Sequence, residues 1–125
     1  MSSIFPTFLI DDNATAASIT TVTVDGYATA SRIGTTTDTT VLSSLTLKNA
    51  AADVSMTVDD TAATLALTVG NMGTSTNTDE AVVTFTAAPT TLNVTVAGNN
   101  YIDLTAAATE TLSVAGSGLL NIADV

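Results

Sequence analysis

Residues 92–122 read LNVTVAGNNYIDLTAAATETLSVAGSGLLNI, and they carry the clearest structural signal in the chain. Within this segment apolar and polar residues alternate in short runs, as in Leu92-Asn93-Val94-Thr95-Val96. Successive side chains of a β-strand point to opposite faces, so this alternation predicts strands with one buried face. The runs begin at positions 92, 102, 112 and 120, which are 8 to 10 residues apart, so the strands are short and evenly spaced.

The same alternation extends through the rest of the chain. Thr supplies 27 of the 125 residues, and its β-branched side chain packs well on a pleated sheet and poorly inside a helix. No apolar pattern of period 3.6 is long enough for an amphipathic helix, so we expect little helix. The sequence therefore predicts an all-β fold with nine short strands, five of them within 19–24, 45–47, 54–58, 65–69 and 83–85.

An internal repeat indicates how these strands are arranged. The run 45–47 aligns with 65–67, and the run 92–94 aligns with 112–114, each at a separation of 20 residues. This repeat favours a parallel β-solenoid with coils of ~20 residues. An antiparallel β-sandwich would give the same alternation and remains the alternative. We expect one domain over 1–125, with the polar, turn-rich segment 70–81 as an inserted loop.

Composition excludes several classes of function. Lys48 and Arg32 stand against twelve acidic residues, and a net charge of −10 repels nucleic acid. Cys and His are absent, which removes thiolate nucleophiles, imidazole bases and the usual zinc ligands. No apolar stretch approaches the ~20 residues that span a bilayer as a helix, so no membrane insertion is expected. We therefore expect a protein that is not an enzyme.

Acidic residues in predicted turns are the candidate metal ligands. Calcium prefers hard oxygen ligands, which Asp59, Asp60, Asp79 and Glu80 could supply at one edge of the coils. The spacing matches no EF-hand loop, and solvated turn residues would give the same pattern. Calcium is thus a possible ligand, and no other cofactor is expected.

A binding surface is the second candidate site. Asn71 and Asn77 lie in the segment 70–81, and Tyr27 and Tyr101 are the aromatic residues that could join them in contacting a ligand or glycan.

Stacked Thr residues can also form a flat array of hydroxyl and methyl groups that binds ice. The 20-residue alignment predicts that this array is broken, because the equivalent positions read Thr46, Ala66, Asn93 and Ser113.

The segment 88–122, with the runs Val22-Thr23-Val24-Asp25-Gly26-Tyr27 and Leu45-Thr46-Leu47-Lys48-Asn49, resembles the Thr/Ala-rich repeats of proteobacterial S-layer proteins and related type I-secreted surface proteins. The resemblance implies a repetitive β-fold in an extracellular array or adhesin stalk, exported through a C-terminal signal outside this chain. Members of this group often bind calcium through Gly-Gly-x-Gly-x-Asp repeats, which this sequence lacks.

These observations together predict a structural module of a bacterial cell-surface layer or adhesin stalk. It would act by self-association, by contact with neighbouring modules, or as a rigid spacer. The alternative is a ligand- or glycan-binding module of an adhesin or phage fibre. Because the chain stops in a predicted strand, we expect a piece of a longer repetitive protein or a subunit covered by a neighbour.

Overall fold

The computed structural model describes residues 5–11, 18–35, 41–59, 61–75, 78–86 and 89–122. Within these ranges the chain forms strands and turns and no helix, and hence no helix that could cross a membrane. The strands are β1 (Leu9–Ile10), β2 (Thr21–Asp25), β3 (Ser31–Ile33), β4 (Ser44–Lys48), β5 (Ser55–Val58), β6 (Thr64–Met72), β7 (Ala81–Phe85), β8 (Thr91–Thr105), β9 (Thr111–Gly116) and β10 (Leu119–Ile122).

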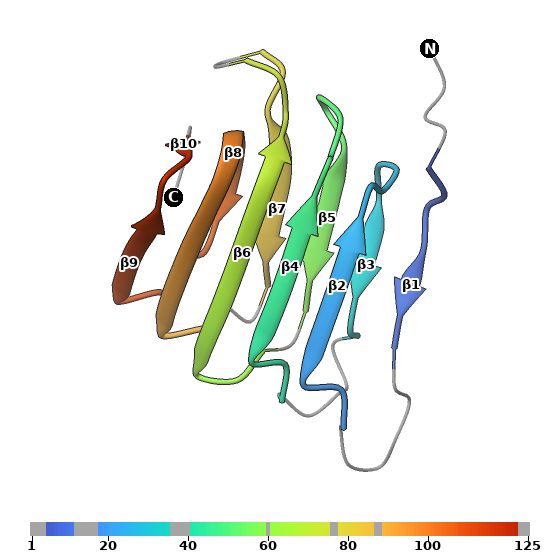
Figure 1. Cartoon of the computed structure of the whole chain (residues 1–125). Helices are drawn as coiled ribbons and strands as arrows, with labels where there is room; N and C mark the ends of the chain where they lie inside the picture. Colours follow the sequence, from blue (N-terminus) through green and yellow to red (C-terminus); the bar gives the residue numbers. More distant parts are fainter. Residues whose placement is uncertain are drawn as a thin grey trace.

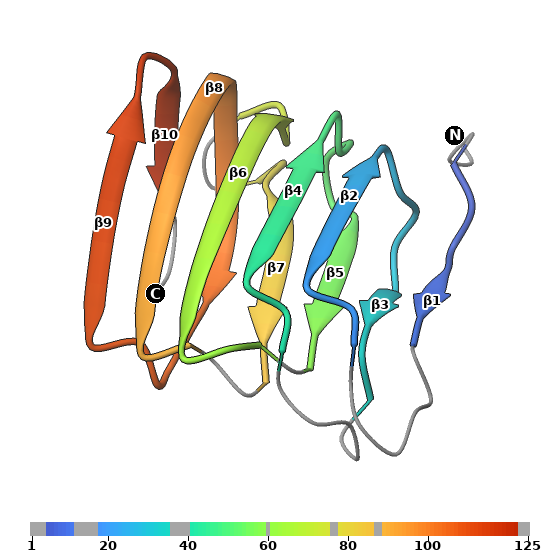
Figure 2. The same ribbon diagram turned by 60° about the horizontal axis from the view of Figure 1, so that its bottom comes forward.

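The strands form two parallel layers that the chain visits in turn (Figures 1 and 2). One layer contains β2, β4, β6, the first part of β8 and β9, and we call it the front layer. The back layer contains β1, β3, β5, β7, the second part of β8 and β10. All of these pairings are parallel, which confirms the β-solenoid and overturns the β-sandwich alternative.

The register differs from the predicted repeat in one half of the chain. Leu92 pairs with Leu112, as the 20-residue alignment predicts. Leu45 pairs with Leu67 rather than Leu65, so that coil is 22 residues long and the predicted alignment is wrong by two residues. Strand alternation has period two, so a two-residue error keeps the same faces apolar and cannot be detected from the pattern.

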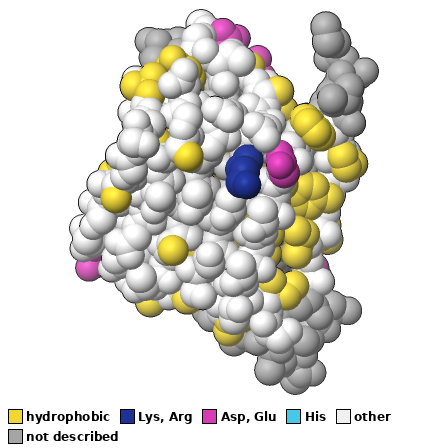
Figure 3. Space-filling model, in the orientation of Figure 1, with side chains coloured by type: hydrophobic (Ala, Val, Ile, Leu, Met, Phe, Trp, Pro, Cys, Tyr) yellow, Lys and Arg dark blue, Asp and Glu magenta, His cyan; other side chains and the backbone are white. Residues whose placement is uncertain are grey.

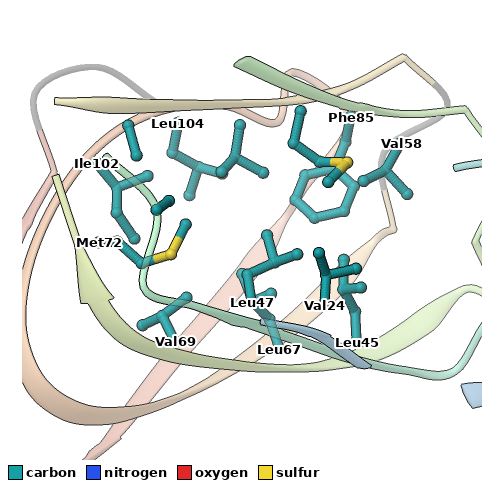
Figure 4. Close-up of a cluster of buried hydrophobic side chains, with 14 of the residues drawn as sticks. Val24, Leu45, Leu47, Val58, Leu67, Val69, Met72, Phe85, Ile102 and Leu104 are labelled. Carbon is teal, nitrogen blue, oxygen red and sulfur yellow. The ribbon is translucent and has the colours of Figure 1, made fainter. Parts of the chain in front are cut away.

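The core lies between the two layers, where the inward side chains form columns along the solenoid. One column runs through Val22, Leu45, Leu67, Val94 and Val114, each paired with the next. Figure 4 shows side chains of the front layer, such as Leu47 and Val69, facing Phe85 and Leu104 of the back layer. Most of these side chains are fully buried, so even a thin interior rich in small residues forms one continuous core.

Each coil turns from the front to the back layer at a corner that needs left-handed backbone. Gly26, Asn49, Asn71 and Gly98 occupy this corner with φ of 76°, 54°, 57° and 68°. Gly and Asn tolerate this conformation best, which explains their presence there. The Asn49 side-chain amide donates to Asp25 Oδ1 at 2.6 Å, and that of Asn71 donates to Asn49 Oδ1 at 3.4 Å. Side-chain hydrogen bonds therefore join successive corners.

Several predicted elements have different bounds. The strands β1 and β3 were not predicted, because two or three residues are too few to show alternation. The runs beginning at 92 and 102 belong to one strand, β8, which passes from the front to the back layer around Gly98. Of the expected loop 70–81, Gly70–Met72 belongs to β6 and Ala81 to β7, and Ser75 pairs with Asp79 in an antiparallel bridge between them.

Candidate functional site

Asp59 is buried in the structure rather than placed in a solvated turn. It is 1% exposed, its carboxylate forms an ion pair with Arg32, and Thr86 Oγ1 donates to its Oδ1 at 2.8 Å. A buried carboxylate is stable only with such partners. The three residues come from neighbouring coils at the same end of the back layer, so this contact ties coils together.

Asp79 lies in the connection between β6 and β7. Its Oδ2 accepts hydrogen bonds from Ser75 Oγ at 2.7 Å and from Thr78 Oγ1 at 3.1 Å. The carbonyl of the neighbouring Glu80 accepts from the Asp53 amide at 2.9 Å. These bonds hold Asp79 to Ser75 and Thr78 in the connection between β6 and β7, which we call the hairpin. Asp60 lies outside the described residues.

No group of three or more acidic side chains that could hold a metal ion forms within the part of the chain that the structure describes. Asp59 is already engaged by Arg32, and Asp79 by its hairpin neighbours. Calcium binding stays a prediction from the sequence, and the geometry adds no support to it.

The described residues that were expected to form a binding surface, Tyr27, Asn71 and Tyr101, differ in their exposure and contacts. Tyr27 is completely buried, so its assignment as a contact residue is wrong. Its hydroxyl has no hydrogen-bond partner among the described residues, and burial raises the pKa of that hydroxyl well above its ordinary value because the phenolate would lose its hydration. Asn71 lies at the corner between the layers, where its side-chain amide donates to Asn49. Asn77 lies outside the described residues.

The backbone of Tyr101 lies close to the segment between β6 and β7. Tyr101 is partly exposed on β8, and a Cβ placed on Gly73 would lie 2.4 Å from the Tyr101 carbonyl oxygen and 2.9 Å from that of Asp79. Gly73 therefore lets the base of the hairpin approach the β8 backbone closely.

The outer face of the front layer carries a Thr column that the predicted alignment concealed. In the observed register Thr23, Thr46, Thr68 and Thr95 pair in sequence, and Ala115 follows. The prediction of a broken array is thus wrong for this column, because it compared Thr46 with Ala66 instead of Thr68. Figure 3 shows this face as largely free of charged and apolar side chains. Such neighbouring hydroxyl and methyl groups stabilise a sheet through cross-strand contacts.

The last described coil has exposed apolar side chains that the alternation alone does not reveal. All six residues of β9 are exposed, including Leu112 at 41% and Val114 at 53%, and Leu119 of β10 is 47% exposed. Val22, in the same column as Val114 at the opposite end, is only 7% exposed. We call β9, β10 and the turn between them, residues 111–122, the end face. Charge gives no signal for it in the sequence, because longer charge-free runs also occur at 61–78 and 81–102.

Comparisons with known proteins give no relationship: no family model matches the chain, and neither the curated proteins nor the solved structures contain a match.

Proposed function

We propose that this chain is a non-catalytic structural module, a rigid spacer in an extracellular bacterial surface layer or adhesin stalk. The observation that carries the proposal is the coil-by-coil stacking of parallel strands, which continues through the described solenoid with one register shift between Gly70 and Met72. Each layer is joined from coil to coil by parallel pairing, and the core columns run the length of the described solenoid. Bending such a stack would require many backbone hydrogen bonds to lengthen together.

Hydrogen bonds and an ion pair between side chains of successive coils support the same role. The amides of Asn49 and Asn71 join corners of successive coils, and the contact of Arg32 with Asp59 joins two coils of the back layer. Asn100 is fully buried, and its amide donates to the Leu119 carbonyl at 3.2 Å while its Oδ1 accepts from the Met72 amide at 3.2 Å. These contacts hold coils to one another, as a spacer requires.

The placement at a cell surface rests on the resemblance of residues 88–122 to S-layer repeats. Proteinase treatment of intact cells of the source organism tests it, with the surviving protein measured by immunoblotting. Loss of the protein from intact cells, with a cytoplasmic marker preserved, is the expected result. Protection in intact cells and loss only after lysis would contradict the surface assignment.

A binding module is the second candidate, because Tyr101 is partly exposed and its backbone lies beside the segment that contains Ser75 and Asp79. A partly exposed tyrosine next to polar side chains is a common arrangement for contacting sugars and proteins. Dose-dependent binding on a glycan array, lost in Tyr101→Ala and kept in Thr57→Ala, would favour this candidate over a purely structural module. The absence of any binding would remove it.

A further inference from the structure

Two buried polar side chains, Asp59 and Asn100, contact the coils on both sides of their own coil. Asp59 is 1% exposed and directly follows β5, and Asn100 is completely buried and lies in β8 beyond the corner at Gly98. In a solenoid each coil ordinarily contacts only the coil before it and the coil after it. A side chain that bonds to both neighbours at once therefore links two coils that do not touch each other.

Asp59 links the coils on either side of the β4–β5 coil. Its Oδ2 forms the ion pair with Arg32 of β3, and its Oδ1 accepts from Oγ1 of Thr86, the residue directly after β7, at 2.8 Å. The backbone follows the same path, because the Thr86 amide donates to the Val58 carbonyl at 3.0 Å. One carboxylate therefore ties the β2–β3, β4–β5 and β6–β7 coils together.

Asn100 forms the equivalent link further along the solenoid. Its Oδ1 accepts from the Met72 amide of β6 at 3.2 Å, and its Nδ2 donates to the Leu119 carbonyl of the end face at 3.2 Å. Met72 lies at the register shift between β6 and β8, and there a side-chain oxygen takes the place of a backbone acceptor. One side-chain amide therefore ties the β6–β7, β8 and β9–β10 coils together.

We propose that Asp59 and Asn100 are clamps that make the coils of this solenoid open as one unit rather than one after another. The two clamps share the β6–β7 coil, so together they span the stack from β2 to β10. Opening the β2–β3 coil would take Arg32 away from the Asp59 carboxylate, and the loss of this counter-charge destabilises the next coil. Opening the β9–β10 coil would take away one partner of Asn100, whose remaining hydrogen bonds weaken because bonds through one polar group strengthen each other.

This inference rests on the proposed spacer role and adds a property to it. A spacer whose coils open only together keeps its full length until the whole unit unfolds. A stack held only by contacts between adjacent coils would instead shorten its folded part from one end, one coil at a time.

A double-mutant cycle tests the Asp59 clamp, because its two partners lie in coils that are not adjacent. Arg32→Met and Thr86→Val each remove one partner of the carboxylate, and Val keeps the shape of the Thr side chain. Urea unfolding followed by circular dichroism gives the unfolding equilibrium constant of each variant. We expect the double variant to raise this constant by at least about threefold more than the product of the two single effects, because Thr86 is the last partner once Arg32 is gone.

The matched control combines Arg32→Met with Thr84→Val. Thr84 lies in the same strand as the residues leading to Thr86, where it pairs with Thr57 and Thr105, and it is not a partner of the Asp59 carboxylate. The effects of these two changes should multiply to within about twofold, as they do for residues that share no partner.

Hydrogen exchange of backbone amides tests the joint opening itself. In the native chain, buried residues from four successive coils of the front layer should share one opening equilibrium constant, that of global unfolding: Val24, Leu47, Val69 and Val96. Asn100→Leu should divide the unit, so that the Val96 amide opens at least about tenfold more often than the Val24 amide. Asn99→Leu, which changes the exposed neighbour, should leave the two amides alike.

Three results would overturn the clamps. They are a cycle of Arg32 and Thr86 that is as multiplicative as the control, native amides that open coil by coil from one end, and equal opening of Val24 and Val96 in a folded Asn100→Leu chain. The first two need no Asn100 variant, so they decide the matter even if Asn100→Leu does not fold. All three leave the surface spacer role to its own test, the proteinase treatment of intact cells.

Discussion

Replacing Asn100 by Leu should remove the most connected polar side chain in the core. Asn100 is fully buried, and besides Leu119 its amide donates to the carbonyls of Ala97 at 3.0 Å and Gly98 at 3.3 Å. Its Oδ1 accepts from the amide of Met72, itself a fully buried residue. Leu has the same number and branching of side-chain heavy atoms as Asn but can make none of these bonds, so the Met72 amide would be left buried without its acceptor.

The size of the effect follows from these contacts. A buried donor left unpaired costs about 1–3 kcal/mol, and losing the hydrogen bonds to the carbonyls adds to this, so Asn100→Leu should lower the free energy of unfolding by roughly 2–4 kcal/mol. For a chain of this length that corresponds to a fall in Tm of roughly 8–16 °C.

Urea unfolding followed by circular dichroism measures the difference. Asn99→Leu is the control, because this neighbour is exposed and should change stability by less than about 0.5 kcal/mol. Equal stability of the two variants would refute the reasoning that Asn100 joins the coils through its hydrogen bonds.

Three further predictions concern the core and the ionisable groups. Leu92→Ala should lower the free energy of unfolding by about 2–5 kcal/mol, measured with urea, because Leu92 is fully buried. Leu112→Ala, at the paired but 41%-exposed position, should lower it by less than about 1 kcal/mol. Equal losses would contradict the exposure of Leu112. Arg32→Met removes the charge that neutralises the buried carboxylate of Asp59, and should lower the free energy of unfolding by about 1–3 kcal/mol. The loss is smaller than for a fully buried ion pair because the Arg32 side chain is 43% exposed. An unchanged urea midpoint would argue against the ion pair. The raised pKa of Tyr27 means that the folded state keeps a proton which the unfolded state loses above about pH 10, so the free energy of unfolding should fall as pH rises beyond that point. Tyr27→Phe should abolish this part of the fall. An ultraviolet titration in which Tyr27 ionises before the chain unfolds would contradict the prediction.

The fold class could be predicted from the sequence because one physical signal recurs throughout it. Alternation of period two, as in the run 92–96, reports which side chains face inward, and the structure confirms these faces. Alternation does not report register, since sliding a strand by two residues changes nothing in the pattern. That is why the 20-residue repeat correctly pairs Leu92 with Leu112 but wrongly pairs Leu45 with Leu65 instead of Leu67.

The candidate sites were less predictable because burial depends on the whole fold. Asp59 looks like a turn residue in sequence, yet Arg32 lies 27 positions away and neutralises it in the next coil. Tyr27 follows the corner residue Gly26 and is carried inward by the turn. The local sequence around Asp59 and Tyr27 gives no sign that either side chain is buried.

The stacking of parallel strands in the observed register is the central claim, and nuclear Overhauser contacts between backbone protons test it most directly. We expect contacts from Thr46 to both Thr23 and Thr68, with no close contacts between α-protons of neighbouring strands in the front layer. Close contacts between α-protons across those strands, which mark antiparallel pairing, or contacts from Thr46 to Ala66 in place of Thr68, would contradict the account.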